Sequence, residues 1–217
     1  MSFFFLLRLK FCLVKDQIQV IRIYYKNWRF AVVDMSLGLL YLFSNPYRMC
    51  RKFLQKKKVA NIHAYGETPL ATLEKMAKAF AIQPSDRWLE LGSGRGRGCF
   101  WMSQFWGCEV RGVDFVPTFI SRASWLSKTF SLRSVDFQQK EMMETDFSWP
   151  TVVFLYSTCM SDEEINALLV PMRSLPMGAR VITISEPISH PNYILTNSLP
   201  VSFPWGKTTA YLHTYYS

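Results

Sequence analysis

The sequence has little of the chemistry that builds metal sites and disulfide frameworks. It contains five cysteines and three histidines in 217 residues. The cysteines form no Cys-x-x-Cys pair, their number is odd, and the histidines lie far apart in the sequence. Disulfide frameworks need paired cysteines, and zinc clusters need closely spaced ligands. The pattern therefore indicates neither a disulfide framework nor a zinc cluster, predicts no metal site, and favours a reducing, cytoplasmic location.

Long uninterrupted hydrophobic runs are also absent. The stretch MSFFFLLRLKFCLV is broken by Arg8 and Lys10 and is followed by no small-residue cleavage pattern, which argues against a secretory signal. The stretch FAVVDMSLGLLYLF contains Asp34 and is shorter than the roughly 20 residues that a membrane-spanning helix needs. Two interpretations stay open for this region. It forms helices that cap the main domain, or it is an interfacial membrane anchor, since six cations follow in YRMCRKFLQKKK.

Acidic residues are scarce only in the first part of the chain. The formal net charge is +9, but residues 1–60 hold 12 Lys and Arg against two Asp, whereas the remainder holds 13 Lys and Arg against 14 Asp and Glu. We therefore expect a basic, apolar helical N-terminal segment at residues 1–60 and a second domain at residues 61–217. Contact with nucleic acid or with a membrane surface is expected through the first of these. Nothing in the sequence fixes an oligomeric state.

Strand and helix signals alternate through residues 61–217. The run TVVFLYS is continuously apolar, which is typical of a strand buried between two helical layers. The C-terminal tail lacks helical periodicity and indicates two strands joined around Trp205 and Gly206. The pattern predicts an α/β fold with a doubly wound, Rossmann-like sheet of seven strands, an antiparallel C-terminal strand pair, and helices before the domain.

A glycine-rich turn follows the first predicted strand, in RWLELGSGRGRGC. In no frame does it have the Gly-x-Gly-x-x-Gly spacing of dinucleotide sites, and no Lys-Ser or Lys-Thr follows it as in a phosphate-binding P-loop. Instead, Glu90 stands just before Gly92, the first glycine. A carboxylate there repels a pyrophosphate, but it suits a ligand that carries an ammonium and a sulfonium.

A second acid, Asp114, ends the next predicted strand in RGVDF, 22 residues beyond Gly92. A carboxylate at this place can accept hydrogen bonds from both hydroxyls of a ribose, and ligands of doubly wound sheets bind outside the carboxyl ends of the strands. We therefore predict that the turn binds S-adenosylmethionine (SAM). For the turn taken alone, a tight strand-to-helix connection without a ligand is the alternative.

The stretches ELGSGRGRG and GVD resemble the first motif and the following acid of class I SAM-dependent methyltransferases, over about residues 60–217. The stretches YGETPLATLEKM and TVVFLYSTCMSDEEINALLVPMRSLPMGARVITISEPI resemble the non-SET lysine methyltransferases of the telomeric-silencing-disruptor type. Membrane-attached lysine methyltransferases, in which an apolar segment precedes the same kind of domain, are similar as well. The resemblance implies a SAM cofactor and a lysine side chain of a protein as the methyl acceptor.

The resemblance also assigns roles to individual residues. Those implied to bind the cofactor surround the methionine end, the ribose and the adenine: Glu67, Thr68, Glu90, Gly92, Ser93, Gly94, Gly96, Asp114, Glu141 and Met142. Within this set, Glu67 faces the ammonium, Asp114 holds the ribose, and Glu141 and Met142 meet the adenine. Those implied to act beside the reacting methyl group are Tyr65, Tyr156 and Ser157. The eukaryotic members of the family carry two asparagines where this chain has Tyr156 and Ser157.

The function predicted from the sequence is therefore methyl transfer from SAM to a protein side chain, with lysine as the acceptor. Tyr65, Tyr156, Phe203 and Trp205 are candidates for the walls of an apolar acceptor channel. Cys159 is not expected to be catalytic, because the Pro-Cys motif that accompanies such a cysteine in RNA cytosine methyltransferases is absent. Two alternatives stay open: an RNA or small-molecule methyltransferase, and a SAM-binding interaction module without turnover.

Overall fold

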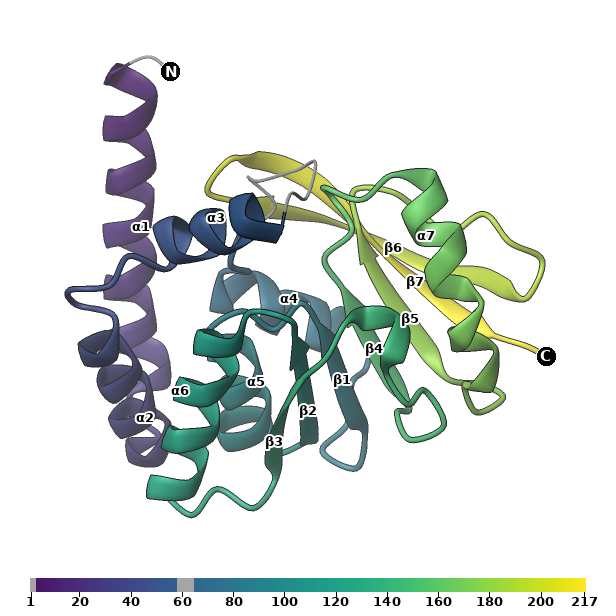
Figure 1. Cartoon of the computed structure of the whole chain (residues 1–217), viewed down its shortest axis with the longest axis horizontal. Coiled ribbons are helices and arrows are strands. Elements are labelled where there is room, and N and C mark those ends of the chain that lie inside the picture. The colour runs from purple at the N-terminus through teal and green to yellow at the C-terminus, as the bar shows by residue number, and fades with distance from the viewer. Residues whose placement is uncertain (1–2, 58–64) are drawn as a thin grey trace.

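The computed structural model describes residues 3–57 and 65–217, with side chains from residue 14 onward. Its centre is one seven-stranded sheet with the strand order β3-β2-β1-β4-β5-β7-β6 (Figure 1). The strands are β1 (Arg87–Leu91), β2 (Glu109–Asp114), β3 (Val135–Gln139), β4 (Val152–Leu155), β5 (Arg180–Ile184), β6 (Tyr193–Phe203) and β7 (Gly206–Tyr215). Strands β1 to β5 pair in parallel, whereas β7 is antiparallel to both β5 and β6. The predicted fold class, including the strand pair around Trp205 and Gly206, is confirmed.

Helices cover both faces of the sheet because each central strand buries side chains on alternate sides. Leu89 and Leu91 of β1 face α7 (Asp162–Leu169) and the short 3-10 turn Pro171–Ser174. Trp88 of the same strand faces the larger core, which contains α4 (Leu70–Ala79), α5 (Arg97–Trp101) and α6 (Pro117–Thr129). Glu90 points to the same side of the sheet as Trp88, since side chains alternate along a strand. Its carboxylate therefore enters the otherwise apolar core that contains α4, α5 and α6.

The N-terminal segment forms three helices, α1 (Phe3–Tyr24), α2 (Trp28–Leu40) and α3 (Pro46–Lys57). Tyr24, Phe30 and Leu37 are fully buried and share one apolar cluster with α4, α5 and α6. The first turns of α1 extend beyond the rest of the molecule, and α3 crosses over the end of the sheet at which β1 and β2 finish (Figure 1). Within residues 3–57 and 65–217, no helix is both long and apolar enough to cross a membrane.

Two helix boundaries differ from the sequence-based expectation. The sequence predicts Thr68 as the cap of α4 and Pro69 as its first residue, but the helix begins at Leu70 and no side chain caps it. The stretch GCFWMSQFW predicts one helix, but α5 passes into a π-helical turn, Met102–Trp106, that ends at Gly107 with φ 96°. In both places the local propensity is helical, and tertiary packing decides where the backbone changes.

Candidate functional site

The glycine-rich turn lies at the carboxyl end of β1 and adopts a backbone conformation that few side chains tolerate. Gly92, Gly94 and Gly96 have φ values of 75°, 54° and 80°, in the left-handed region where glycine is favoured. The amides of Gly92 and Ser93 both donate to the carbonyl of Val113, at 2.8 and 2.9 Å. The turn is therefore tied to the end of the neighbouring strand β2.

Asp114 fixes the other side of the turn. Its carboxylate accepts from the amide of Gly94 at 2.8 Å and from the amide of Val116 at 2.8 Å, and the residue is buried. Burial raises the pKa of Asp114 to about 6, although the two amide donors oppose the shift. Each carboxylate oxygen keeps a further acceptor position beyond its amide bond, and Asp114 lines a cavity at the end of the sheet.

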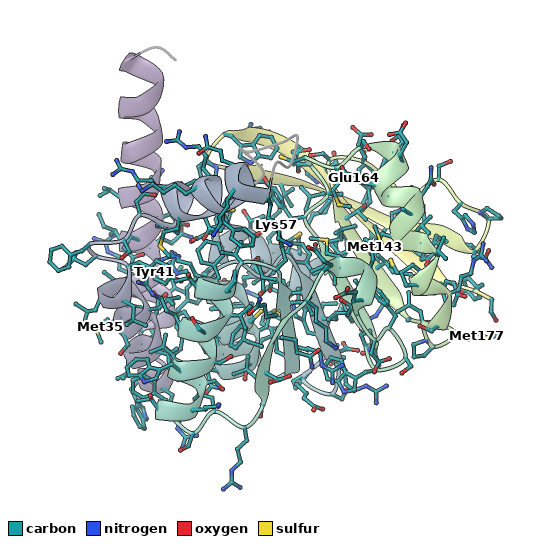
Figure 2. The ribbon with its side chains drawn as sticks, viewed as in Figure 1. Met35, Tyr41, Lys57, Met143, Glu164 and Met177 are labelled. Atoms are coloured by element: carbon teal, nitrogen blue, oxygen red, sulfur yellow. The ribbon has the colours of Figure 1, made fainter. Side chains whose placement is uncertain are left out.

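The cavity at the end of the sheet has a volume of about 320 Å³. It is called the larger cavity below, because a smaller one adjoins it. The helix α3 forms one wall with Cys50, Leu54 and Lys57, none of which the sequence patterns single out. Figure 2 marks Lys57, Met143 and Glu164, three lining residues from different elements. The predicted residues that line it are Tyr65, Gly92, Asp114, Glu141, Met142 and Tyr156. The structure thus brings together side chains from α3, the glycine turn and the ends of β2, β3 and β4.

Glu141 is placed at the mouth of this cavity. Its carboxylate lies 3.4 Å from the Nζ of Lys57, with both side chains about half exposed. An exposed pair of this kind contributes only about 0–1 kcal/mol, so Glu141 is available to an incoming ligand. Met142 follows Glu141 and reaches back over the turn. If Gly92 carried a Cβ, that atom would lie 3.2 Å from the Cε of Met142.

A smaller cavity of about 30 Å³ adjoins the first on the other side of Gly92. Its lining includes Arg95, Arg97 and seven predicted residues, namely Glu67, Thr68, Glu90, Gly92, Ser93, Gly94 and Tyr156. The Oγ of Ser93 is buried and has no hydrogen-bond partner within the described residues. A buried polar atom without a partner is costly, so this hydroxyl indicates a place for a polar ligand group.

The two arginines of the turn, Arg95 and Arg97, are both paired with acids. Arg95 forms a bidentate pair with Glu67. Arg97 forms a bidentate pair with Asp34, at 2.7 and 2.9 Å, and also donates to Gln17. The N-terminal helices α1 and α2 therefore hold the start of α5. No sequence signal connects Asp34 to a position 63 residues away.

Glu90 is enclosed beneath the turn. Its Oε2 accepts long hydrogen bonds from the indole of Trp88 and the thiol of Cys99, each at 3.4 Å. Burial raises the pKa of Glu90 to about 7, and the bonds from Cys99 and Trp88 offset only part of this rise. A carboxylate with so raised a pKa is a candidate for interaction with a cation.

A Glu90→Gln substitution is expected to change how stability depends on pH. The folded chain raises this pKa from 4.5 to about 7, so the protonated carboxyl contributes stability that is complete below pH 4.5 and is lost as the pH rises through 7. Between about pH 4 and pH 8 the variant should therefore gain on the order of 3 kcal/mol relative to the wild type. Urea unfolding at a series of pH values measures the difference.

The matched control is Glu109→Gln, at an exposed position where β2 begins. Its stability relative to the wild type should not change across the same pH range. If the curves of Glu90→Gln and the wild type run parallel, the carboxyl of Glu90 titrates alike in the folded and unfolded chain, and burial does not raise its pKa.

Tyr156 and Ser157, both predicted to act beside the reacting group, are placed differently by the structure. Tyr156 lines both cavities, and its hydroxyl accepts from the indole of Trp205 at 2.7 Å. Ser157 lines neither cavity. Its hydroxyl donates to the carbonyl of Ile184 at 2.8 Å and accepts from the amide of Ile184 at 3.2 Å. Ser157 therefore joins the end of β4 to β5, and its predicted role beside the reacting group stays a prediction.

Gly96, predicted to bind the cofactor, lines neither cavity and stands at the N-cap of α5. A Cβ placed on it would lie 2.5 Å from the ring of Phe137 and 3.3 Å from the Cβ of Ala123. The missing side chain therefore allows α5, α6 and β3 to approach closely, and the glycines of this stretch that line a cavity are Gly92, Gly94 and Gly98.

Comparison with solved structures places this geometry among known folds. An RNA methyltransferase from Salinibacter ruber, in complex with S-adenosylhomocysteine, matches 69% of this chain and 94% of its own with a TM-score of 0.55 and 24% identity. A variant of MtNAS in complex with SAM matches 67% of this chain and 61% of its own, with a TM-score of 0.55 and 13% identity. The chain has the class I methyltransferase fold.

A protein related in sequence gives a second comparison. The methyltransferase-fold chain is 27% identical over 135 residues to a histone-lysine N-methyltransferase, specific for lysine 79 of histone H3, from Dictyostelium discoideum. The match covers 55% of this chain but only 7% of that protein. No family model matches the chain. The solved structures support the resemblance to class I methyltransferases, and the sequence relative agrees with the resemblance to non-SET lysine methyltransferases.

Proposed function

We propose that this protein is a SAM-dependent methyltransferase. The observation that carries the proposal is the grouping of acids around the glycine turn at two adjoining cavities. Asp114 and Glu141 line the larger cavity, and Glu67 and Glu90 line the smaller one. Glu67 and Glu141 face Arg95 and Lys57, whereas Asp114 and Glu90 accept hydrogen bonds from neutral donors. Carboxylates in the latter setting disfavour a polyphosphate and suit an adenosine derivative that carries a sulfonium and an ammonium.

The residues present fit the cofactor. Asp114 would hold the ribose hydroxyls, Glu141 and Met142 would meet the adenine, and the turn with Glu90 would hold the methionine portion. The partnerless hydroxyl of Ser93 supports a polar group of the ligand in the smaller cavity. When bound, SAM supplies a methyl group that its sulfonium already activates, so the chain's own residues need chiefly to align the acceptor and exclude water.

We propose a lysine side chain of a protein as the acceptor. Tyr156 lines both cavities, and its ring contacts Phe203, which in turn stacks on Trp205. An aromatic wall of this kind desolvates an amine, which lowers the amine's pKa and favours the neutral, nucleophilic form. The acidic first turn of α7, with Asp162, Glu163 and Glu164, also suits a cationic approach.

RNA is the second candidate acceptor, and one observation favours it. The helix α3 borders the larger cavity and exposes five cations, Arg48, Arg51, Lys52, Lys56 and Lys57. Such a cluster suits a phosphate backbone. The same segment carries our proposal of peripheral membrane contact, because Leu39, Leu42 and Phe43 are exposed in the region preceding α3.

Incubation with SAM labelled on its methyl group and a cell lysate tests the acceptor. We expect a labelled protein band that survives ribonuclease and yields methyl-lysine on hydrolysis. Label that ribonuclease removes would favour RNA as the acceptor and reject lysine. If calorimetry detects SAM binding while no fraction becomes labelled, the protein is a binding module without turnover.

A further inference from the structure

A separate cavity lies at the end of the sheet opposite to the glycine turn. It has a volume of about 450 Å³ and lies between the start of α2 and the loop that joins α6 to β3. Figure 1 shows this loop at the far end of the sheet from α3. None of its lining residues lines the larger or the smaller cavity. It is called the distal cavity below, and neither the glycine turn nor its acids take part in it.

Two arginines give the distal cavity an excess of positive charge. Of the described residues that line it, none is an aspartate or a glutamate, whereas Arg29 and Arg133 each carry a guanidinium. Within the part of the chain whose side chains are described, neither guanidinium forms a hydrogen bond or an ion pair. The arginines of the glycine turn, by contrast, are paired with Glu67 and Asp34. Both cations of the distal cavity are therefore available to an anion, and a guanidinium binds a phosphate with two parallel hydrogen bonds.

Aromatic and apolar side chains lie beside these cations. Trp28 lines the distal cavity and is 69% exposed, and the guanidinium carbon of Arg29 lies 5.7 Å from the centroid of its ring. Phe130 and Leu132 line the cavity from the loop before β3. An exposed indole is a surface on which an aromatic base stacks. Because Arg29 directly follows Trp28, a phosphate bound by the arginine would bring an attached base close to the indole.

We propose that the distal cavity binds a mononucleotide, with its phosphate held by Arg29 and Arg133 and its base stacked on Trp28. Ser131 and Ser134 also line the cavity and offer hydroxyls to the phosphate or the sugar. Small-molecule sites have volumes of about 300–1,000 Å³ and combine an apolar lining with a few polar groups, as this cavity does. The inference does not depend on the proposed function, because it uses no residue of the cofactor site.

A free mononucleotide is favoured over a nucleotide within an RNA strand. Proteins that bind single strands present a positively charged groove that follows the backbone over several nucleotides. The lining of the distal cavity is confined to the first turns of α2, the loop before β3 and Gln104. It offers two cations and one exposed indole, which is the complement of one phosphate and one base.

Calorimetry on the full chain tests the proposal with the four ribonucleoside 5′-monophosphates, the corresponding nucleosides and inorganic phosphate. We expect at least one monophosphate to bind more tightly than its nucleoside and more tightly than phosphate. Arg133→Met should weaken that monophosphate by about 10- to 150-fold, since a charge-assisted hydrogen bond is lost, and leave the nucleoside unchanged. Trp28→Ala should weaken the monophosphate by about 5- to 150-fold, since a stacked base is lost, and leave phosphate unchanged.

Two matched variants serve as controls. Trp125→Ala removes another indole, which is 55% exposed on α6, and Arg173→Met removes another exposed arginine. Neither residue lines the distal cavity or the two cavities at the glycine turn, so both variants should bind the monophosphate as the wild type does. Thermal unfolding checks that Trp28→Ala and Arg133→Met stay folded, which we expect because both side chains are exposed.

Other results would overturn the proposal. If the wild type binds no monophosphate, the distal cavity is not a nucleotide site. If a monophosphate binds and both Trp28→Ala and Arg133→Met bind it equally well, the nucleotide lies elsewhere, for example in the cofactor site. If Arg133→Met alone weakens binding, the cavity recognises an anion and not a base. If a single-stranded oligouridylate binds through these residues while uridine monophosphate does not compete with it, the ligand is a nucleic-acid strand instead.

Discussion

Asp114→Asn is expected to lower the affinity for SAM by about 10- to 150-fold at neutral pH. Asp114 uses both carboxylate oxygens to hold the amides of Gly94 and Val116. An asparagine turns an NH2 group toward one of these donors, and the buried donor left without an acceptor costs about 1–3 kcal/mol of folding stability, in the free and the ligand-bound protein alike. The variant also loses the charged acceptor proposed for the ribose, which contributes about 1.5–3 kcal/mol.

Calorimetry with SAM and with S-adenosylhomocysteine measures the change. The control is Asp136→Asn on the neighbouring strand β3, where the carboxylate is exposed and lines neither cavity. That variant should bind both ligands as the wild type does. An unchanged affinity of Asp114→Asn would mean that the ribose lies away from the end of β2, and the proposed cofactor site would then be wrong.

The sheet and its ligand-binding end were predictable because their signals are local. Continuous apolar runs mark the buried strands, and the spacing of Gly92, Gly94 and Asp114 follows from the chain's path from β1 to β2 and back to the same edge. Parallel strands place these residues together whatever the rest of the chain does. The structure confirms this part of the fold, and the acids that the sequence pattern selects do line the two cavities.

The contribution of the N-terminal segment was not predictable in the same way. Its high positive charge indicated a partner outside the protein, yet its two acids both lie near Arg97, with Asp34 in a bidentate pair and Asp16 at 4.0 Å. Because Asp16 and Asp34 both lie near Arg97, they do not offset the positive charge of the segment's exposed Lys and Arg residues. Which acid meets which arginine depends on how α1 and α2 pack, and no sequence periodicity records that.

Tyr156 and Ser157 are adjacent in the sequence but lie in different surroundings. Both follow Leu155, the last residue of β4; Tyr156 lines both cavities, whereas the hydroxyl of Ser157 bonds the backbone of Ile184. The resemblance to a residue pair does not distinguish the two positions. Within β1, side chains alternate between the two faces of the sheet, so Glu90 shares its side with Trp88 and enters the layer beneath the turn.

Gly96→Ala is expected to destabilise the fold by about 2–5 kcal/mol. The left-handed backbone, with φ 80°, costs a residue with a Cβ about 1–2 kcal/mol. The new Cβ would lie 2.5 Å from Phe137, a buried ring packed against Phe100, and such overpacking costs about 1–3 kcal/mol. In a chain of this size the midpoint of thermal unfolding should fall by roughly 4–20 °C.

Gly178→Ala separates the two contributions to that loss. Gly178 has φ 81°, nearly the same as Gly96, but a Cβ placed on it would meet nothing within 4 Å. Backbone strain alone should lower its unfolding midpoint by roughly 2–8 °C. Equal losses in both variants would show that Phe137 yields to the added methyl group. A clearly larger loss for Gly96→Ala than for Gly178→Ala means that Gly96 is needed for the contact of α5 with β3. Of these two positions, Gly96 is the one where the ring of Phe137 already fills the space that the new Cβ would take.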